Sequence, residues 1–184
     1  MIEVVVGLIV LGVGLYLWIP VYNNFQRLRQ SALENLSNIE VFIQQRSDMI
    51  LAIVQMAKRY NIHESTTFKE TAEARNKIFH PPAEMNERVK ALSDIENSFL
   101  KMQAVAEAYP DLKAELIQSR VLESDVLIET RLAQSRVEYN KVAREYNYQV
   151  QFFPKSIIAM VHGFRPVAYI AFKEKEYEPR KIYE

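Results

Sequence analysis

The chain of 184 residues contains no cysteine and only four glycines. Without cysteine it has no disulfides, no thiolate metal sites and no cysteine nucleophile. Three of the glycines (Gly7, Gly12 and Gly14) precede residue 23, which leaves Gly163 alone in the rest of the chain. Phosphate-binding loops and tight hairpins depend on glycine because they need positive φ angles. We therefore predict that the chain after residue 22 is almost wholly helical.

An excess of charge of either sign is also absent, because 23 basic residues balance 23 acidic ones. Nucleic-acid-binding domains usually present a basic surface, so nucleic acid is not an expected partner. Histidine is scarce, and none of His63, His80 and His162 stands three residues after a glutamate, as a carboxylate di-iron bundle requires. No HExxH motif and no serine–histidine–aspartate set can be assembled. We expect no metal, no cofactor and no catalytic residue.

The chain does contain an apolar run, Val4 to Tyr22, that has no Asp, Glu, Lys or Arg. A helix needs roughly 20 apolar residues to cross a bilayer, so residues 1–22 are predicted to form a transmembrane anchor. The aromatic residues Tyr16, Trp18 and Tyr22 gather at one end of the run, where such rings favour the headgroup level. A cleaved signal peptide is the alternative, but the basic n-region and small-residue cleavage site are missing.

The flanks of this run predict an orientation. Arg27 and Arg29 follow it, whereas only the amino terminus and Glu3 precede it, so the positive-inside rule places the bundle in the cytoplasm. Pro20 removes a backbone donor and is expected to kink or interrupt the helix.

Beyond the anchor, apolar residues recur at steps of three and four, which is typical of helices packed in a bundle. The pattern predicts helices over about 24–60, 67–79, 83–109 and 112–150, the second begun by a Thr67–Glu70 capping box and the last by Asp111. Their lengths and short connections predict an all-α fold. We expect an elongated antiparallel bundle of three long helical layers, the middle one broken.

The C-terminal part is predicted in three pieces. Ser156 to Val161 should form a short apolar helix that caps one end of the bundle and stops at Gly163. Val167 to Phe172 should be extended, and a charged tail follows it. The predicted organisation is therefore an anchor over 1–22, a helical bundle over 23–164 and a tail over 165–184.

Polar residues interrupt the apolar stripes at Arg46, Glu129 and Arg136. Because a buried charge is costly unless it is paired, we expect Arg46 to contact Glu129 across the core and set the helix register. A ligand-binding or catalytic role for the same charges is the alternative.

A second polar feature is a repeat seven residues apart, Tyr139-Asn140 and Tyr146-Asn147, which lies on one helix face. Tyrosine hydroxyls at the rim and asparagines bonding across helices explain this repeat. A binding site there is the alternative.

The chain resembles the LemA family over nearly all of its length after Pro20. The resemblance is carried by short pieces in a fixed order: Tyr22-Asn23; Val41 to Val54 with Arg46, Asp48 and Ile50; Tyr60; His63-Glu64; Ala74-Arg75; Tyr109 to Ala114; Glu129; Arg136 to Asn140; Tyr146-Asn147; Pro154; and Gly163-Phe164. Gln45 departs from the family, which usually has a second arginine there. Leu51-Ala52 stands where Pro-Asn is usual, so the first helix should be straighter here, and the usual long insertion is reduced to Phe79 to Ala83.

The resemblance implies a membrane-anchored antiparallel bundle of the bacterial envelope, in the inner membrane, with no established enzymatic activity and no assigned catalytic residue. We expect a scaffold or interaction protein that self-associates as a homo-oligomer or binds membrane-protein partners. A ligand sensor or enzyme that uses Arg46, Glu129, Arg136 and Tyr139 is the alternative, and an accessory subunit of a membrane protease or transporter is a third hypothesis.

Overall fold

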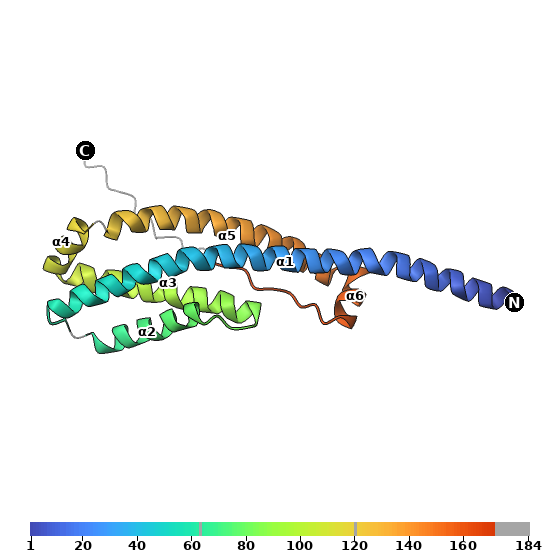
Figure 1. Cartoon of the computed structure of the whole chain (residues 1–184), viewed down its shortest axis with the longest axis horizontal. Helices are drawn as coiled ribbons and strands as arrows, with labels where there is room; N and C mark the ends of the chain where they lie inside the picture. The colour runs from blue at the N-terminus through green and yellow to red at the C-terminus, as the bar shows by residue number, and fades with distance from the viewer. Residues whose placement is uncertain (63, 120, 172–184) are drawn as a thin grey trace, which may run out of the picture.

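A computed structural model of the chain describes residues 1–62, 64–119 and 121–171, except for the side chains of residues 8–11, 13, 15 and 121–124. Its helices, in chain order, are α1 (Ile2–Arg59), α2 (Ser65–Phe79), α3 (Met85–Ala108), α4 (Pro110–Gln118), α5 (Val121–Gln151) and α6 (Lys155–Val161). No strand occurs in these described ranges, which confirms the all-α prediction. Helices α1 and α3 run in one direction and α2 and α5 in the other, so the bundle is elongated and antiparallel (Figure 1).

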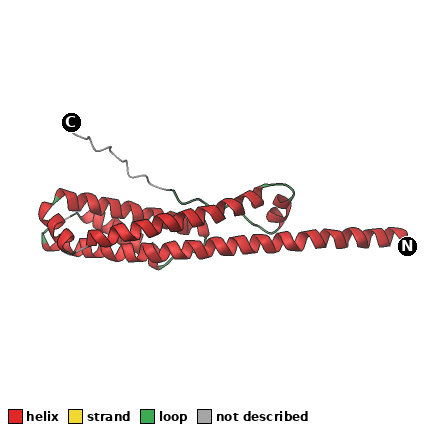
Figure 2. Ribbon diagram, turned by 90° about the horizontal axis from the view of Figure 1, so that it is seen from above, coloured by secondary structure: helices red, strands yellow, loops and turns green. Residues whose placement is uncertain are grey.

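Helix α1 is the axis of the molecule. It is continuous for 58 residues, or roughly 87 Å, and its N-terminal part projects alone beyond the other helices (Figures 1 and 2). The predicted interruption at Pro20 is wrong, since Pro20 lies inside α1. Proline removes one backbone hydrogen bond there, and the helix continues on both sides of it. Helix also continues through Leu51 and Ala52, as the lack of proline at these positions predicted.

The core lies along the predicted apolar stripes. On α1 and α3 the inward side chains are fully or almost fully buried: Phe25, Ala32, Leu36, Ile39, Ile43, Ile50, Ile53 and Ala57 on the first, and Met85, Val89, Leu92, Ile95, Phe99, Met102 and Ala106 on the second. Each large apolar side chain buried in this way contributes about 1.5–3 kcal/mol to folding. Packing along these stripes therefore holds the bundle together.

The middle layer differs from the prediction of one broken helix. Helices α2 and α3 lie side by side as a hairpin, and both pack on α1 (Figure 1). The chain reverses between Phe79 and Met85, where Pro81 and Pro82 prevent helix. Because Thr71, Ala74 and Ile78 of α2 are buried, the bundle has four helices side by side where α2 is present.

Two predicted helix starts are wrong. Helix α2 begins at Ser65, before Thr67, whose carbonyl accepts a hydrogen bond from the Thr71 hydroxyl inside the helix, and Glu70 pairs with Lys101 of α3. The start of α4 is Pro110, with Tyr109 as N-cap, so Asp111 lies within the first turn. Proline suits that first position because the helix has no partner for its N–H.

The predicted single helix over 112–150 is in fact two helices. Helix α4 ends at Gln118, where the Ser119 hydroxyl donates to the Leu116 carbonyl, and α5 begins at Val121. Near the start of α5, Val126 is 68% exposed, whereas its neighbour Asp125 is buried.

The C-terminal part follows the prediction more closely. Helix α6 packs against α1 and α5 at the end of the bundle, and the chain leaves it through Gly163, whose φ of 70° is readily adopted only by glycine. Residues 164–171, called the strap below, are not helical and run back along the bundle. Phe172 and the rest of the predicted tail lie outside the described residues.

Among the residues that the structure describes, no helix is both long and apolar enough to cross a membrane. Six apolar side chains of the predicted anchor, at positions 8–11, 13 and 15, lie outside that set. The transmembrane anchor therefore stays a prediction from the sequence.

We predict that Ile43→Ala lowers the free energy of unfolding by about 2–5 kcal/mol, because Ile43 is fully buried and its truncation leaves a cavity. The measurement is urea unfolding of the full chain in mild detergent, followed by circular dichroism. Leu51→Ala on the same helix is the control. Its side chain is 40% exposed, so a change within about 0.5 kcal/mol is expected. Equal losses in the two variants would contradict the packing described.

Candidate functional site

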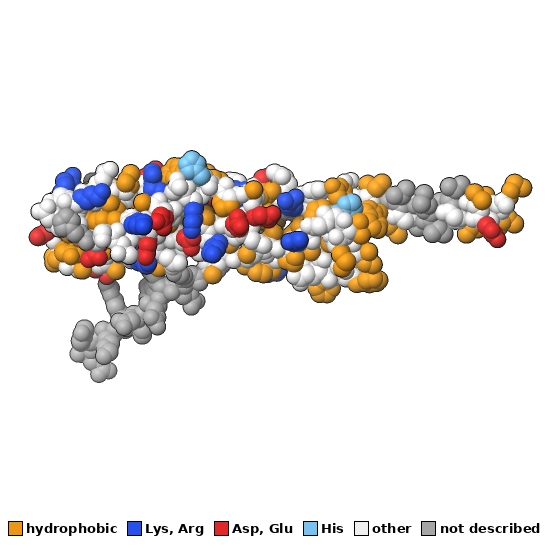
Figure 3. Space-filling view, turned by 90° about the horizontal axis from the view of Figure 1, so that it is seen from below, with side chains coloured by type: hydrophobic (Ala, Val, Ile, Leu, Met, Phe, Trp, Pro, Cys, Tyr) orange, Lys and Arg blue, Asp and Glu red, His pale blue; other side chains and the backbone are white. Residues whose placement is uncertain are grey.

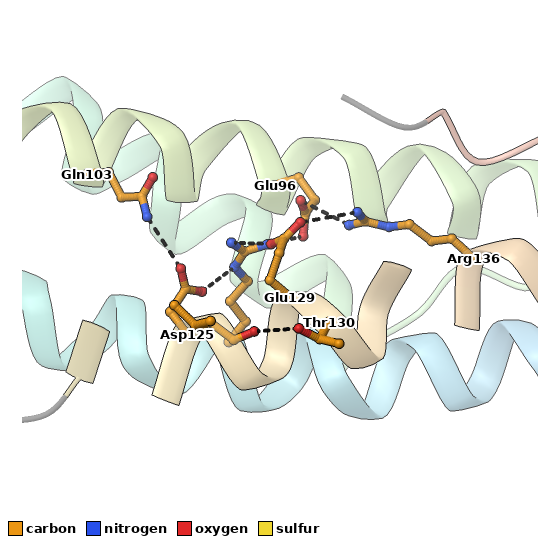
Figure 4. A network of polar contacts seen from close by, with 8 residues as sticks. Glu96, Gln103, Asp125, Glu129, Thr130 and Arg136 are labelled. Carbon is orange, nitrogen blue, oxygen red and sulfur yellow. Dashed lines mark hydrogen bonds and ion pairs between the residues drawn. The ribbon is translucent and has the colours of Figure 1, made fainter. Parts of the chain in front are cut away.

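A cluster of charges lies inside the bundle where α1, α3 and α5 face one another. Glu96 comes from α3, and Asp125, Glu129 and Arg136 come from α5 (Figure 4). Arg46 comes from α1. On α5 the three residues stand at steps of four and seven, which places them on one face of the helix. The cluster therefore brings together all three charges that the sequence placed on the apolar stripes, with two more.

Arg46 is the centre of this cluster. Its guanidinium contacts three carboxylates: Nη1 lies 2.9 Å from Glu96 Oε1, Nε 3.1 Å from Asp125 Oδ1, and Nη2 2.7 Å from Glu129 Oε2. The carbon of the guanidinium also lies 3.9 Å from the centroid of the Phe99 ring, at cation–π distance. The predicted contact between Arg46 and Glu129 is confirmed.

Arg136 joins two of the same carboxylates from the other side. Its Nη2 lies 3.0 Å from Glu96 Oε2, and its Nη1 lies 3.9 Å from Glu129 Oε1. Both arginine side chains are at least nine-tenths buried, whereas Glu129 is 39% exposed. The cluster therefore has both arginines in the interior and one carboxylate, Glu129, at its rim.

These contacts leave little room for a ligand. A cavity of about 50 Å³ reaches Glu96 and Arg136, whereas small-molecule sites typically measure about 300–1,000 Å³. A carboxylate bonded to arginine is also less available to a metal ion. Among the described residues, no group of three or more histidine and carboxylate side chains could hold a metal ion.

Tyr139 makes its hydrogen bond outside the charge cluster. It is fully buried, and its hydroxyl donates a hydrogen bond of 2.9 Å to the Ala168 carbonyl of the strap. Burial raises the pKa of the phenol to about 12, because the ionised form is poorly solvated there. The phenol therefore keeps its proton near neutral pH.

The two asparagines of the repeat hold the strap to α5. Asn140 donates to the Ile170 carbonyl at 2.8 Å and accepts from its N–H at 2.9 Å, and Asn147 makes the same pair of bonds with Val167, both at 2.8 Å. On the other side, Asn86 of α3 accepts from the Ala168 N–H at 2.7 Å. The expected bonds across helices are therefore wrong, because these amides bind the backbone of the strap.

The second tyrosine of the repeat has a packing role. Tyr146 is almost fully buried in a small cluster with Phe25, Val150, Ala159 and Phe164, at the end of the bundle where α6 lies. Burial raises the pKa of this phenol as well.

Two of the three aromatic residues predicted at the membrane interface, Trp18 and Tyr22, contact His162, the residue directly after α6. The Trp18 indole N–H donates to His162 Nε2 at 3.0 Å, and the Tyr22 and His162 ring centroids are 4.6 Å apart. Tyr16 is exposed on the projecting part of α1.

Several paired charges were not predicted. Asp125 and Glu96 complete the cluster, and Arg88 Nε bonds Glu40 Oε1 at 2.7 Å between α3 and α1. The hydrogen bond that Arg88 donates to the Glu40 carboxylate raises the pKa of Arg88. Asp125 could have been found, because it stands four residues before Glu129, on the same face of one helix. Glu96 and Glu40 carry no such signal, because their partners lie on other helices.

We predict that Arg46→Met lowers the free energy of unfolding by about 3–5 kcal/mol, because it leaves buried carboxylates without their cation. Unfolding in urea at neutral pH measures this loss. Arg59→Met is the matched control on the same helix. Arg59 is 62% exposed and pairs with Glu115 at the surface, so a loss of at most about 1 kcal/mol is expected. A small loss in both variants would contradict a structural role for the cluster.

We further predict that Tyr139→Phe changes how stability depends on pH. The pKa of Tyr139 is about 12 in the folded chain and about 10 when unfolded. Between these values the unfolded chain releases a proton that the folded chain keeps, so stability present below pH ~10 is lost as pH rises.

Tyr139→Phe should not show this fall in stability at alkaline pH. At neutral pH it should be less stable than the unmodified chain by about 1 kcal/mol, because the Ala168 carbonyl loses its donor. The free energies of unfolding of the two proteins, measured at a series of alkaline pH values, should therefore converge as pH rises. If the difference between the two free energies of unfolding stays constant with pH, Tyr139 ionises as easily in the folded chain as in the unfolded one.

Comparison with known proteins gives the family. Residues 35–183 match the family described as the LemA family. Two relatives are the magnetosome proteins MamQ 2 of Paramagnetospirillum magneticum (strain AMB-1) and MamQ of Magnetospirillum gryphiswaldense (strain MSR-1), each 26% identical over 179 residues. The alignment covers 84% of this chain but only 65% of each relative's length. Because the family match extends over most of the helical bundle and the strap, this chain belongs to the LemA family.

Proposed function

We propose that this protein is a non-enzymatic, membrane-anchored helical bundle of the bacterial envelope that acts by association, as a homo-oligomer or as a scaffold for membrane-protein partners. The observation that carries the proposal is the free end of α1, which projects beyond the bundle with Val4, Val5 and Val6 more than half exposed (Figure 3). Exposed apolar surface of this kind marks a membrane or protein contact.

A membrane is a better match for this end than a protein partner, because this end has almost no charged residues. No Asp, Glu, Lys or Arg occurs from Val4 to Gln26, and the first basic residues are Arg27 and Arg29. The proposal is a single pass through the inner membrane by residues 1–22, with the bundle on the cytoplasmic side. The names of the relatives, which are magnetosome proteins, agree with a role at a membrane.

Association is the better match for the bundle because its interior charges are bonded to one another, with a cavity of only about 50 Å³ beside them. Its outer surface does offer a contact. Where α1 and α5 lie side by side, a groove of about 400 Å³ is lined by Asn35, Asn38, Val41, Phe42, Arg131, Gln134, Ser135 and Glu138. Mixed apolar and polar surface is usual for an interface between proteins, and we place the contact between two copies here.

The test is disulfide crosslinking in vesicles, which the cysteine-free chain makes simple. The full-length variant Val41→Cys, reconstituted and oxidised, should form covalent dimers, because Val41 is 51% exposed in the groove. Ile117→Cys is the matched control, an equally exposed apolar residue on α4 at the far end of the bundle, and should stay monomeric.

A second test measures the oligomeric state of the unmodified protein in mild detergent. Dimers or larger species agree with self-association. A strictly monomeric protein that also recovers no membrane protein on chemical crosslinking would count against the whole proposal, whereas oligomers without a Val41 crosslink would move the contact to another face.

A further inference from the structure

Residues 152–161, called the foot below, form a turn and helix α6 at the end of the bundle from which α1 projects (Figure 1). Their large apolar side chains are mostly exposed: Phe152 at 54%, Phe153 at 80%, Ile157 at 50%, Met160 at 82% and Val161 at 64%. Of the remaining apolar residues, Ala159 is buried and Ile158 packs against the cluster around Phe25. Helix α6 is therefore apolar on its outer face as well as on its inner one.

A helix that is apolar on all sides is usually buried in a protein core or in a membrane. The hydrophobic side chains of this region are visible as a continuous patch in the space-filling view (Figure 3). Exposing this patch to water is unfavourable by about 25 cal/mol for each Å² of apolar surface. We therefore expect another apolar surface to cover the foot.

The position of the foot along α1 indicates what covers it. The residue directly after α6, His162, accepts the hydrogen bond from Trp18 and packs against Tyr22. These two aromatic residues end the proposed anchor, and tryptophan and tyrosine concentrate at the headgroup level of a bilayer. The foot therefore lies at the depth where a membrane anchored by residues 1–22 would have its surface.

The charge of this region agrees with a lipid surface. No Asp or Glu occurs from Phe152 to Phe172, and the charged residues there are Lys155 and Arg165. A short helix with exposed apolar side chains and nearby basic residues resembles the interfacial helices that lie in the headgroup region. A negatively charged leaflet would attract these two cations.

We propose that the foot inserts into the interfacial region of the same bilayer that holds the anchor, with Phe153 and Met160 in contact with lipid. This inference rests on the proposed membrane anchor. The protein would then contact the membrane at two places, because α1 crosses the bilayer and α6 lies in its interfacial region beside α1. The Trp18–His162 bond joins the two contacts, so the bundle is held at a set angle to the membrane rather than swinging about the anchor.

The test uses single cysteines in the full-length chain, each labelled with the environment-sensitive dye nitrobenzoxadiazole. The label is placed at Met160 in the foot, at Val5 in the anchor, or at Ile117 on α4. All three side chains are exposed, so labelling should leave the fold intact. The proteins are reconstituted into vesicles of phosphatidylcholine with equal phosphatidylglycerol, and quenching is measured with iodide in water and with spin-labelled lipids.

The expected result separates the three positions. The Val5 label lies within the proposed span but near its far end, so it should be shielded from iodide and quenched by spin-labelled lipids. The Met160 label should be quenched by lipids labelled near the headgroup, with a blue-shifted emission, and the Ile117 label by iodide alone. Replacing phosphatidylglycerol by phosphatidylcholine should make the Met160 label more accessible to iodide, because Lys155 loses its anionic partner.

Other results would overturn the inference in distinguishable ways. A Met160 label open to iodide while the Val5 label stays in lipid would leave the anchor in place and remove the foot contact. A Met160 label shielded from both quenchers would assign the patch to a second copy of the chain or another protein. A Val5 label open to iodide would remove the anchor itself, and with it the proposed function.

Discussion

Arg46 imposes the strongest constraint in the bundle, because a guanidinium that is 5% exposed must be neutralised by neighbours held at fixed positions. Its three carboxylate partners come from α3 and α5, so the packing of these helices brings the charges together. A shift by one helical turn would leave a buried charge unpaired, which is costly.

The strap extends the same principle to the outside of the bundle. A non-helical segment has backbone donors and acceptors that need partners when it is buried. Asn140 and Asn147 supply donor and acceptor together, and their spacing of seven residues matches two turns of α5. Tyr139 adds a bond between them, so the chain beyond α6 is fastened along α5 and returns toward the charge cluster.

The two ends of the molecule differ for a related reason. At the end near α4 the surface carries charged residues such as Arg59 and Glu115, which suit water. At the other end, α6 and the projecting part of α1 present apolar and aromatic residues, and the small core of Phe25, Tyr146 and Phe164 joins them. This second end is the one that the proposed function places at the membrane.

The sequence by itself determined the helical class, the extent of most helices and the faces that are buried, because periodicity and the scarcity of glycine are local properties. It also determined that Arg46 needs a partner and that Glu129 could be one. Only the tertiary structure decided the hairpin of α2 and α3, the break before α5, and the roles of Glu96 and Asp125. Only it showed that the asparagines bind the strap. These features depend on which surfaces meet in space, and contacts between distant segments leave no periodic signal in the chain.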